Sequence, residues 1–142
     1  MEVRVALLSR TAENLFWIGR YIERAENMAR LLEAGKRMSA TPDDAAAKAE
    51  WEAVLAASGV LSHFSSAYDT VDQDAVVDFV AYSPANPSSI YSCVKTAREN
   101  ARAVRTAFTI DMWSALNEFW LEFSARPKVK SGDGGLMPFL EW

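Results

Sequence analysis

The residues best suited to binding chemistry are Glu23 and Arg24, which stand side by side in the most regular apolar repeat of the chain. A guanidinium group holds a carboxylate through two parallel hydrogen bonds, and a carboxylate accepts hydrogen bonds from an amine. Together with Glu26, the pair is suited to a peptide or an amino-acid-like ligand, with Arg24 on its carboxylate and Glu23 on its amine.

A second group of charges lies further along the chain. Four cations follow one another at steps of three, four and three residues, which puts them in one strip roughly 80° wide on a helix: Lys95, Arg98, Arg102 and Arg105. Like charges at these spacings destabilise a helix mildly, so an acidic partner or an anionic ligand would relieve them. We favour structural partners, namely carboxylates of the 9–38 stretch or solvent, over a phosphate or carboxylate ligand.

The spacing within the 9–38 stretch predicts local ion pairs. Arg20 reaches Glu23 at three residues, and Glu26 reaches Arg30 at four, whereas adjacent helical residues do not face each other. Arg24 has no such partner of its own and falls inside an aromatic-rich stripe. Because a semi-buried guanidinium without an acceptor is costly, we expect a carboxylate or backbone carbonyls from another helix around it.

The same residues also fit a purely structural network between two helices. In that network Glu99 accepts from Arg24, while Arg98 or Arg102 donates to Glu23. Structural ion networks are common in proteins, so we favour the network over a ligand site built from these side chains.

The sequence holds no second constellation of catalytic type. Glu23 and Glu26 have the interval of a carboxylate-bridged metal bundle, but no Glu is followed by His at three residues. His63 has no neighbouring Cys or Ser with an orienting acid, and no glycine-rich phosphate loop occurs. Cys93 falls on an apolar helical stripe, as a small core residue does. The sequence predicts neither a metal nor a cofactor, and it favours a domain that is not an enzyme.

Two long helical repeats position these residues. The 9–38 stretch carries an apolar stripe at steps of three and four, with Trp17 and Tyr21 on a second stripe nearly opposite. A helix with two apolar sides is packed on both, with a narrow strip left for water, as a central bundle helix is. Residues 90–108 repeat the pattern, so we expect these two helices to pack together.

Three further helices complete the expected fold. The first of these helices starts with a cap at Thr41 and runs to Leu61. A short helix follows Asp72, although its apolar run 76–80 also fits a strand. The chain restarts with a cap at Asn86, and a last helix runs from a break at 109–111 to Pro127. The predicted fold is an all-α, compact helical bundle of about five helices, with the first and fourth helices central.

The end of the chain differs from the rest. Residues 1–127 are expected to form the helical bundle domain, and residues 128–142 a flexible loop followed by an apolar C-terminal tail. The tail has three expected fates: it docks on the bundle, contacts a second subunit in a homo-oligomer, or marks where a longer relative continues. In the last case the chain is a half-length version or a fragment.

Composition narrows the classes of protein. The chain has 142 residues, enough for one domain with its own core, and a net charge of −4, which argues against nucleic-acid binding. Its single cysteine excludes an intrachain disulfide. The apolar segment at the N-terminus is too short for the core of a signal peptide, and no run of apolar residues is long enough to span a membrane. We expect a cytoplasmic protein with no membrane contact.

Residues 8–27, LSRTAENLFWIGRYIERAEN, resemble the signature of the bacterial alpha-E domain family, named for its helices and its Glu-Arg motif. Residues 86–90, 97–102 and 112–113 are similar to the second recurring segment of that family, in the same order. The resemblance implies an all-helical protein of uncertain biochemical role that accompanies circularly permuted ATP-grasp ligase-like and transglutaminase-like proteins.

Two hypotheses of function follow. The first is an accessory domain that acts through protein partners, an ATP-grasp-like ligase by family resemblance, in peptide synthesis or modification. The second is a ligand-binding or catalytic site for a peptide or amino-acid-like substrate on the Glu-Arg network, for which the candidate residues are Glu23, Arg24, Glu26, Arg98, Glu99 and Arg102.

Overall fold

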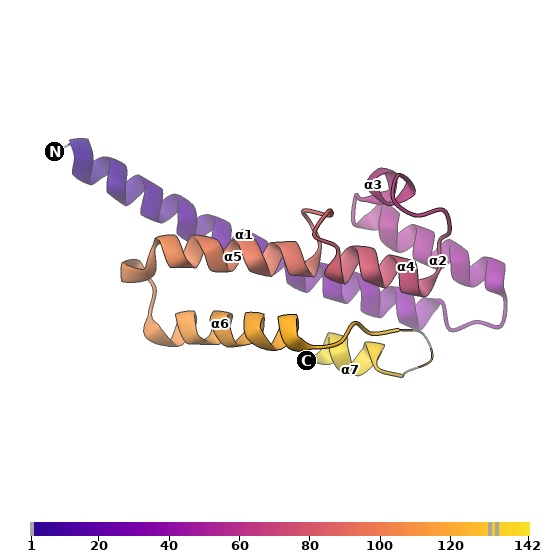
Figure 1. Cartoon of the computed structure of the whole chain (residues 1–142). Helices are drawn as coiled ribbons and strands as arrows, with labels where there is room; N and C mark the ends of the chain where they lie inside the picture. The colour runs from indigo at the N-terminus through magenta and orange to yellow at the C-terminus, as the bar shows by residue number, and fades with distance from the viewer. Residues whose placement is uncertain (1, 131, 133) are drawn as a thin grey trace.

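The computed structural model describes the backbone of residues 2–130, 132 and 134–142, and side chains from residue 8 onward within these ranges. All regular structure in them is helical (Figure 1): α1 (Glu2–Met38), α2 (Asp44–Ala57), α3 (Leu61–Ser65), α4 (Gln73–Val77), α5 (Ile90–Ala103), α6 (Ile110–Ala125) and α7 (Leu136–Glu141). A π-helical turn, Asp78–Tyr82, continues α4, and a 3-10 turn, Arg105–Ala107, follows α5. The all-α prediction is confirmed, and the short helices α3 and α7 are the additions to the five expected.

Helices α1 and α5 form the centre of the bundle, as their matching stripes predicted. They lie side by side and run in opposite directions (Figure 1), and they share a larger contact than any other pair in the described part of the chain. Cys93, Ala97 and Ala101 of α5 are fully buried. Such small side chains let two helix axes approach closely, which explains the extent of this contact.

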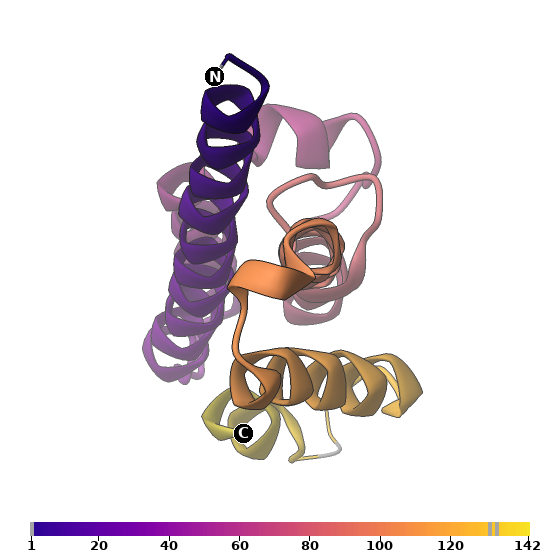
Figure 2. The same ribbon diagram turned by 90° about the vertical axis from the view of Figure 1, so that its left-hand side faces the viewer.

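The described part of the first half of α1, from residue 8 to residue 22, is covered on one side only. Leu15 is 37% exposed and Ile22 is 44% exposed, although both belong to the apolar stripe, and Trp17 on the other stripe is 42% exposed. Figure 2 shows α1 and α6 on different sides of α5, and α1 makes no extensive backbone-level contact with α6 in the described chain. The prediction of two packed sides with a narrow strip for water is wrong for this half of the helix.

The C-terminal half of α1 packs closely against α2. Gly35 is buried there, and a Cβ atom at this position would lie 2.5 Å from Val54 Cγ2 and 2.9 Å from Trp51 Cζ3. Trp51 and Val54 are themselves buried. The contact therefore requires a residue without a side chain at position 35.

The boundaries of α2 differ from those expected. Asp43 is the cap, because its carboxylate accepts from Ala45 N at 3.0 Å, whereas Thr41 Oγ1 accepts from Asp43 N in the turn before it. The helix ends at Ala57 instead of continuing to residue 61. Gly59 adopts a φ of 71°, a left-handed conformation that glycine takes without strain and that stops a helix.

The segment 72–89 is helical and then fastened by side chains. Asp72 caps α4 through Ala75 N at 2.9 Å, so the helix prediction for 76–80 is confirmed and the strand is excluded. Asn86 was expected to cap α5, but it does not. It is fully buried, donates to Phe79 O at 3.1 Å and accepts from Ser88 N at 2.9 Å, while Ser89 caps the helix.

The C-terminal part returns to the bundle. Thr109 caps α6 by accepting from Met112 N at 3.2 Å. After the polar segment, α7 packs against α1 near the C-terminal end of α6 (Figures 1 and 2), and Phe139 is buried with its ring centre 5.5 Å from that of Tyr82. Trp142 stacks on Phe119 at 4.8 Å. Of the three fates considered for the apolar tail, docking on the bundle is the one this structure shows.

Lys128 and Tyr68 both contact Asp78. Tyr68 Oη donates to this carboxylate at 2.6 Å, and Lys128 forms an ion pair with it. Burial alone would raise the pKa of Asp78, but the hydrogen bonds from Lys128 and Tyr68 outweigh it and the pKa is lowered. Burial and the same hydrogen bond raise the pKa of Tyr68 to about 12.

Replacing Asp78 with asparagine should lower the free energy of unfolding at neutral pH by about 1 kcal/mol, because the cluster is partly exposed. A lowered carboxyl pKa contributes stability above its unfolded value of about 4, which is lost as the pH falls through the folded value. The raised tyrosine pKa contributes stability below about 10, which is lost towards pH 12.

Urea unfolding at a series of pH values tests the expected loss of stability at both acid and alkaline pH. In Asp78→Asn the free energy of unfolding should fall less as the pH is lowered below about 4. Its fall at alkaline pH should begin closer to the ordinary tyrosine pKa of about 10. Asp69→Asn is the matched control, because Asp69 is exposed and makes no recorded contact in the described chain. Equal pH profiles for the two variants would show that the Asp78 cluster contributes nothing measurable.

Candidate functional site

Glu23 and Glu26 are both engaged within their own helix. Glu23 Oε2 accepts from Arg20 Nη1 at 2.7 Å, and Glu26 Oε1 accepts from Arg30 Nη2 at 2.5 Å, as the spacing predicted. Both pairs are exposed. Exposed pairs of this kind contribute about 0.3–0.5 kcal/mol each, so they support α1 locally.

Arg24 is exposed, and its recorded partner is a hydroxyl: Nη1 lies 3.5 Å from Ser88 Oγ. The expectation of a semi-buried guanidinium held by a carboxylate or backbone carbonyls is therefore wrong. The cause is the register of the two helices. The turn before α5 lies against Arg24, and Glu99 stands nine residues beyond Ile90, or about 14 Å further along the helix axis.

The cations of α5 and of the 3-10 turn after it face α6 and solvent. Arg98 Nε donates to Asn117 Oδ1 at 2.9 Å, and the guanidinium carbons of Arg98 and Arg105 each lie 5.7 Å from the centre of the Trp113 ring. A cation over an indole ring gains about 0.5–1 kcal/mol at an exposed site. Lys95 is exposed. Contacts with α6 and solvent thus take the place of the carboxylates of the first helix.

The six candidate residues do not converge in this structure. Glu99 and Arg102 are exposed, and neither makes a recorded hydrogen bond or ion pair within the described ranges. The cross-helix pairs expected between Glu99 and Arg24, and between Glu23 and Arg98 or Arg102, are replaced by the contacts above. Glu26 alone contributes to the wall of a cavity.

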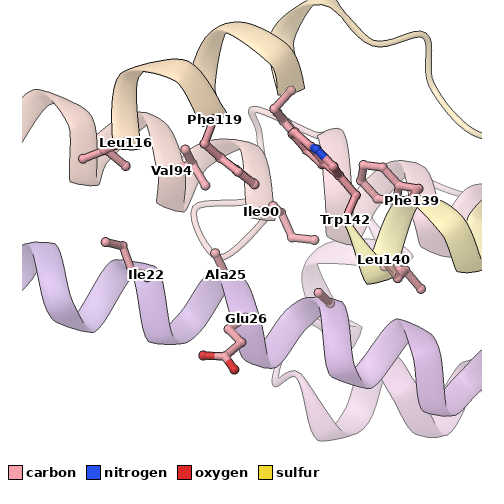
Figure 3. A pocket seen from close by; sticks show the side chains of 12 residues that line it. Ile22, Ala25, Glu26, Ile90, Val94, Leu116, Phe119, Phe139, Leu140 and Trp142 are labelled. Carbon is pink, nitrogen blue, oxygen red and sulfur yellow. The ribbon is translucent and has the colours of Figure 1, made fainter. Parts of the chain in front are cut away.

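That cavity is bordered by four helices. It has a volume of about 360 Å³ and lies between α1, α5, α6 and α7 (Figure 3), and its lining is Ile22, Ala25, Glu26, Ala29, Ile90, Val94, Leu116, Phe119, Phe123, Phe139, Leu140 and Trp142. All but one of these residues are apolar. In Figure 3 the Glu26 carboxylate points away from the space, so the interior offers an apolar surface.

The geometry of the cavity follows from the helix arrangement. Ile22 and Ala25 of α1 point towards the side of Leu116 and Phe119 on α6, with Ile90 of α5 between them (Figure 3). Helix α7 closes one end through Phe139, Leu140 and Trp142. Sequence reasoning missed this cavity. Its signals, the apolar stripe of α1 and the aromatic positions of α6 and of the tail, indicated core packing equally well.

Cys93 occupies a core position, as its place on an apolar stripe predicted. Cys93 is fully buried, and burial raises the pKa of its thiol to about 11 although nearby Arg24 lowers it, so it is a core side chain. His63 lies exposed in α3. In the described part of the chain no three His, Cys, Asp or Glu residues are grouped to hold a metal.

None of the described helices is both long enough and apolar enough to span a bilayer.

The fold and this surface define an all-helical domain with a long, half-covered first helix and an apolar cavity beside it. The chain belongs to the Alpha-E family, described as a predicted alpha-helical domain with a conserved ER motif, whose model matches residues 7–142. The Glu-Arg pair of that description corresponds to the Glu23-Arg24 sequence.

Similar proteins come from mycobacteria. An uncharacterised protein of Mycobacterium bovis and one of Mycobacterium tuberculosis strain CDC 1551 are each 36% identical over 120 residues, covering 75% of this chain and 14% of their own. A third, from strain H37Rv, is 35% identical with the same coverage. This chain thus matches a small part of much longer proteins. No solved structure matches it.

Proposed function

We propose that this protein is a helical accessory domain that works by binding a protein partner, an ATP-grasp ligase-like protein, in cytoplasmic peptide synthesis or modification. One observation carries the proposal: large apolar side chains remain exposed along α1. Leu8 is 65% exposed, Phe16 60% and Trp17 42%. Apolar residues gathered on one exposed helix typically mark a surface that another protein covers.

The relatives support a role beside other protein segments. In each of them the matching region is only 14% of the whole chain. The rest of each relative places other protein segments on the same chain as the equivalent helix, which supports an interaction of this domain with protein surfaces.

The test is complex formation with an ATP-grasp ligase-like protein encoded beside this one, measured by native mass spectrometry. We expect a defined complex, weakened at least about tenfold by Phe16→Ser with Trp17→Ser, since exposed aromatic anchors dominate interface energies. Leu121→Ser is the matched control, because Leu121 is 57% exposed on α6. Failure of the wild-type chain to bind at micromolar concentrations would contradict the proposal.

A second candidate function rests on Arg24. Its exposed guanidinium, beside the Ser88 hydroxyl, has no carboxylate partner among the described residues, so it is free to bind the carboxylate of a peptide or an amino-acid-like ligand. Nuclear magnetic resonance titration with a short peptide that ends in a free carboxylate tests this function. We expect Arg24→Lys to weaken binding, and Arg102→Ala to leave it unchanged if Arg24 acts alone. Unaltered binding in Arg24→Lys would remove this candidate.

A further inference from the structure

Exposed apolar side chains extend two walls of the cavity along α1 and α6, and we call the cavity together with these extensions the α1–α6 groove. On α1 the lining residue Ile22 is preceded by exposed Leu15 seven residues earlier, and on α6 Leu116 is preceded by exposed Met112 four residues earlier. Residues at these intervals share a helix face, so both apolar walls continue beyond the cavity towards the N-terminal end of α1. From Leu15 to Ala29 the α1 wall is about 21 Å long, the rise of roughly 14 helical residues, and α7 already covers part of it.

One end of this groove already holds a helix. Helix α7 inserts Phe139, Leu140 and Trp142 into it, with Trp142 stacked on Phe119 at 4.8 Å and Phe139 buried. The resident segment therefore shows what kind of surface the walls accept: apolar side chains presented at helical spacing. The rest of the groove offers walls of the same kind.

On α1 the charges nearest the cavity form ion pairs, Glu26 with Arg30 and Glu23 with Arg20, whereas α6 and α7 carry carboxylates. Asp111, Glu118 and Glu122 lie exposed in one strip of α6, a helix without a lysine or arginine, and Glu122 stands one turn from the lining residue Phe119. Glu141 is exposed on α7. None of these four carboxylates has a recorded ion pair in the described ranges, and the nearby cation Arg126 lies over the Trp142 ring at 3.8 Å. The strip thus favours a basic partner.

We propose that the α1–α6 groove binds one amphipathic helix of a partner protein, with apolar anchors at i, i+3 or i+4, and i+7 and with lysine or arginine along its flank. This inference rests on the proposed function and specifies its docking segment. A second copy of this chain fits less well, because a two-fold interface here would bring two acidic α6 strips together. A small apolar molecule would fill the cavity but leave Leu15 and Met112 exposed.

Two synthetic helical peptides of about 14 residues provide the test, both with leucines on one face and with either lysines or glutamates on the flanks. Calorimetric titration should show the lysine peptide binding at least about tenfold more tightly than the glutamate peptide, with an affinity that falls as salt is added. Ile22→Asn should weaken the affinity for the lysine peptide at least about tenfold. Leu121→Asn, the same loss of an exposed side chain on the opposite side of α6, should not.

Several outcomes would overturn the inference. Equal affinities for the two peptides would remove the charge argument, and equal binding by Ile22→Asn and Leu121→Asn would place the peptide elsewhere. Sedimentation that shows a dimer disrupted by Ile22→Asn would assign the groove to a second copy. If the apolar dye anilinonaphthalene sulfonate binds and neither peptide displaces it, the cavity is assigned to a small molecule.

The ligase complex separates this inference from the proposed function. If the complex forms equally with wild type and Ile22→Asn, the groove inference fails while the accessory role stands. If wild type forms no complex, the accessory role fails, and the peptide titrations still decide whether the groove binds a basic helix. Because Ile22 is 44% exposed, Ile22→Asn is expected to fold, which circular dichroism melting verifies.

Discussion

Gly35→Ala should lower the free energy of unfolding by about 1–2 kcal/mol, although alanine is the better helix former by about 1 kcal/mol. The new methyl group would lie 2.5 Å from Val54 Cγ2 and 2.9 Å from the Trp51 ring. Both neighbours are buried and cannot turn into solvent. The α1–α2 contact must therefore open to admit the methyl group, and chemical denaturation measures the loss.

Gly19→Ala is the matched control within the same helix. Gly19 is exposed, and nothing lies within 4 Å of a Cβ atom there, so alanine should stabilise the protein by about 0.5–1 kcal/mol. Opposite signs for the two substitutions are expected. If both stabilise the protein equally, the close contact between α1 and α2 is not present in solution.

Asn86→Ala should destabilise the protein by about 2–4 kcal/mol. The fully buried amide donates to Phe79 O at 3.1 Å and accepts from Ser88 N at 2.9 Å. Removing it leaves a buried carbonyl and a backbone N–H without these partners, each at a cost of about 1–3 kcal/mol. Thermal and urea unfolding measure the loss of stability.

Asn27→Ala provides the comparison, because Asn27 is exposed on α1 and makes no recorded contact in the described chain. Alanine is the better helix former, so we expect a change of only a few tenths of a kcal/mol, in the stabilising direction. Similar destabilisation by the two alanine substitutions would mean that the 83–89 loop is not fastened by the Asn86 side chain.

Much of the fold was predictable because its signals are local. The three- and four-residue steps of 9–38 and 90–108 indicated two helices with matching stripes, and these helices form the centre of the bundle. Arg20 and Glu23 pair as their spacing predicted. The caps were less predictable, since Asn86 and Ser89 are both suitable capping residues and only the buried bonds of Asn86 distinguish them.

The candidate site was not predictable to the same degree. Spacing showed that Glu23 and Arg24 point in different directions, but Arg24 was expected to meet a carboxylate and instead meets Ser88. The cavity went unnoticed because Ile22 and Phe119 carry the same signal whether a neighbouring helix covers them or leaves them open. Covered and open faces have identical periodicity.

The sequence by itself determined the helices, their apolar faces, the local ion pairs of α1 and the family, because each depends on residues close together along one helix or on a contiguous motif. The tertiary structure alone decided that Arg24 lies against the turn before α5 and that an apolar cavity lies between α1, α5, α6 and α7. The register and placement of distant helices depend on how faces far apart in the sequence fit together, as in the contact between α1 and α5, which no local pattern encodes.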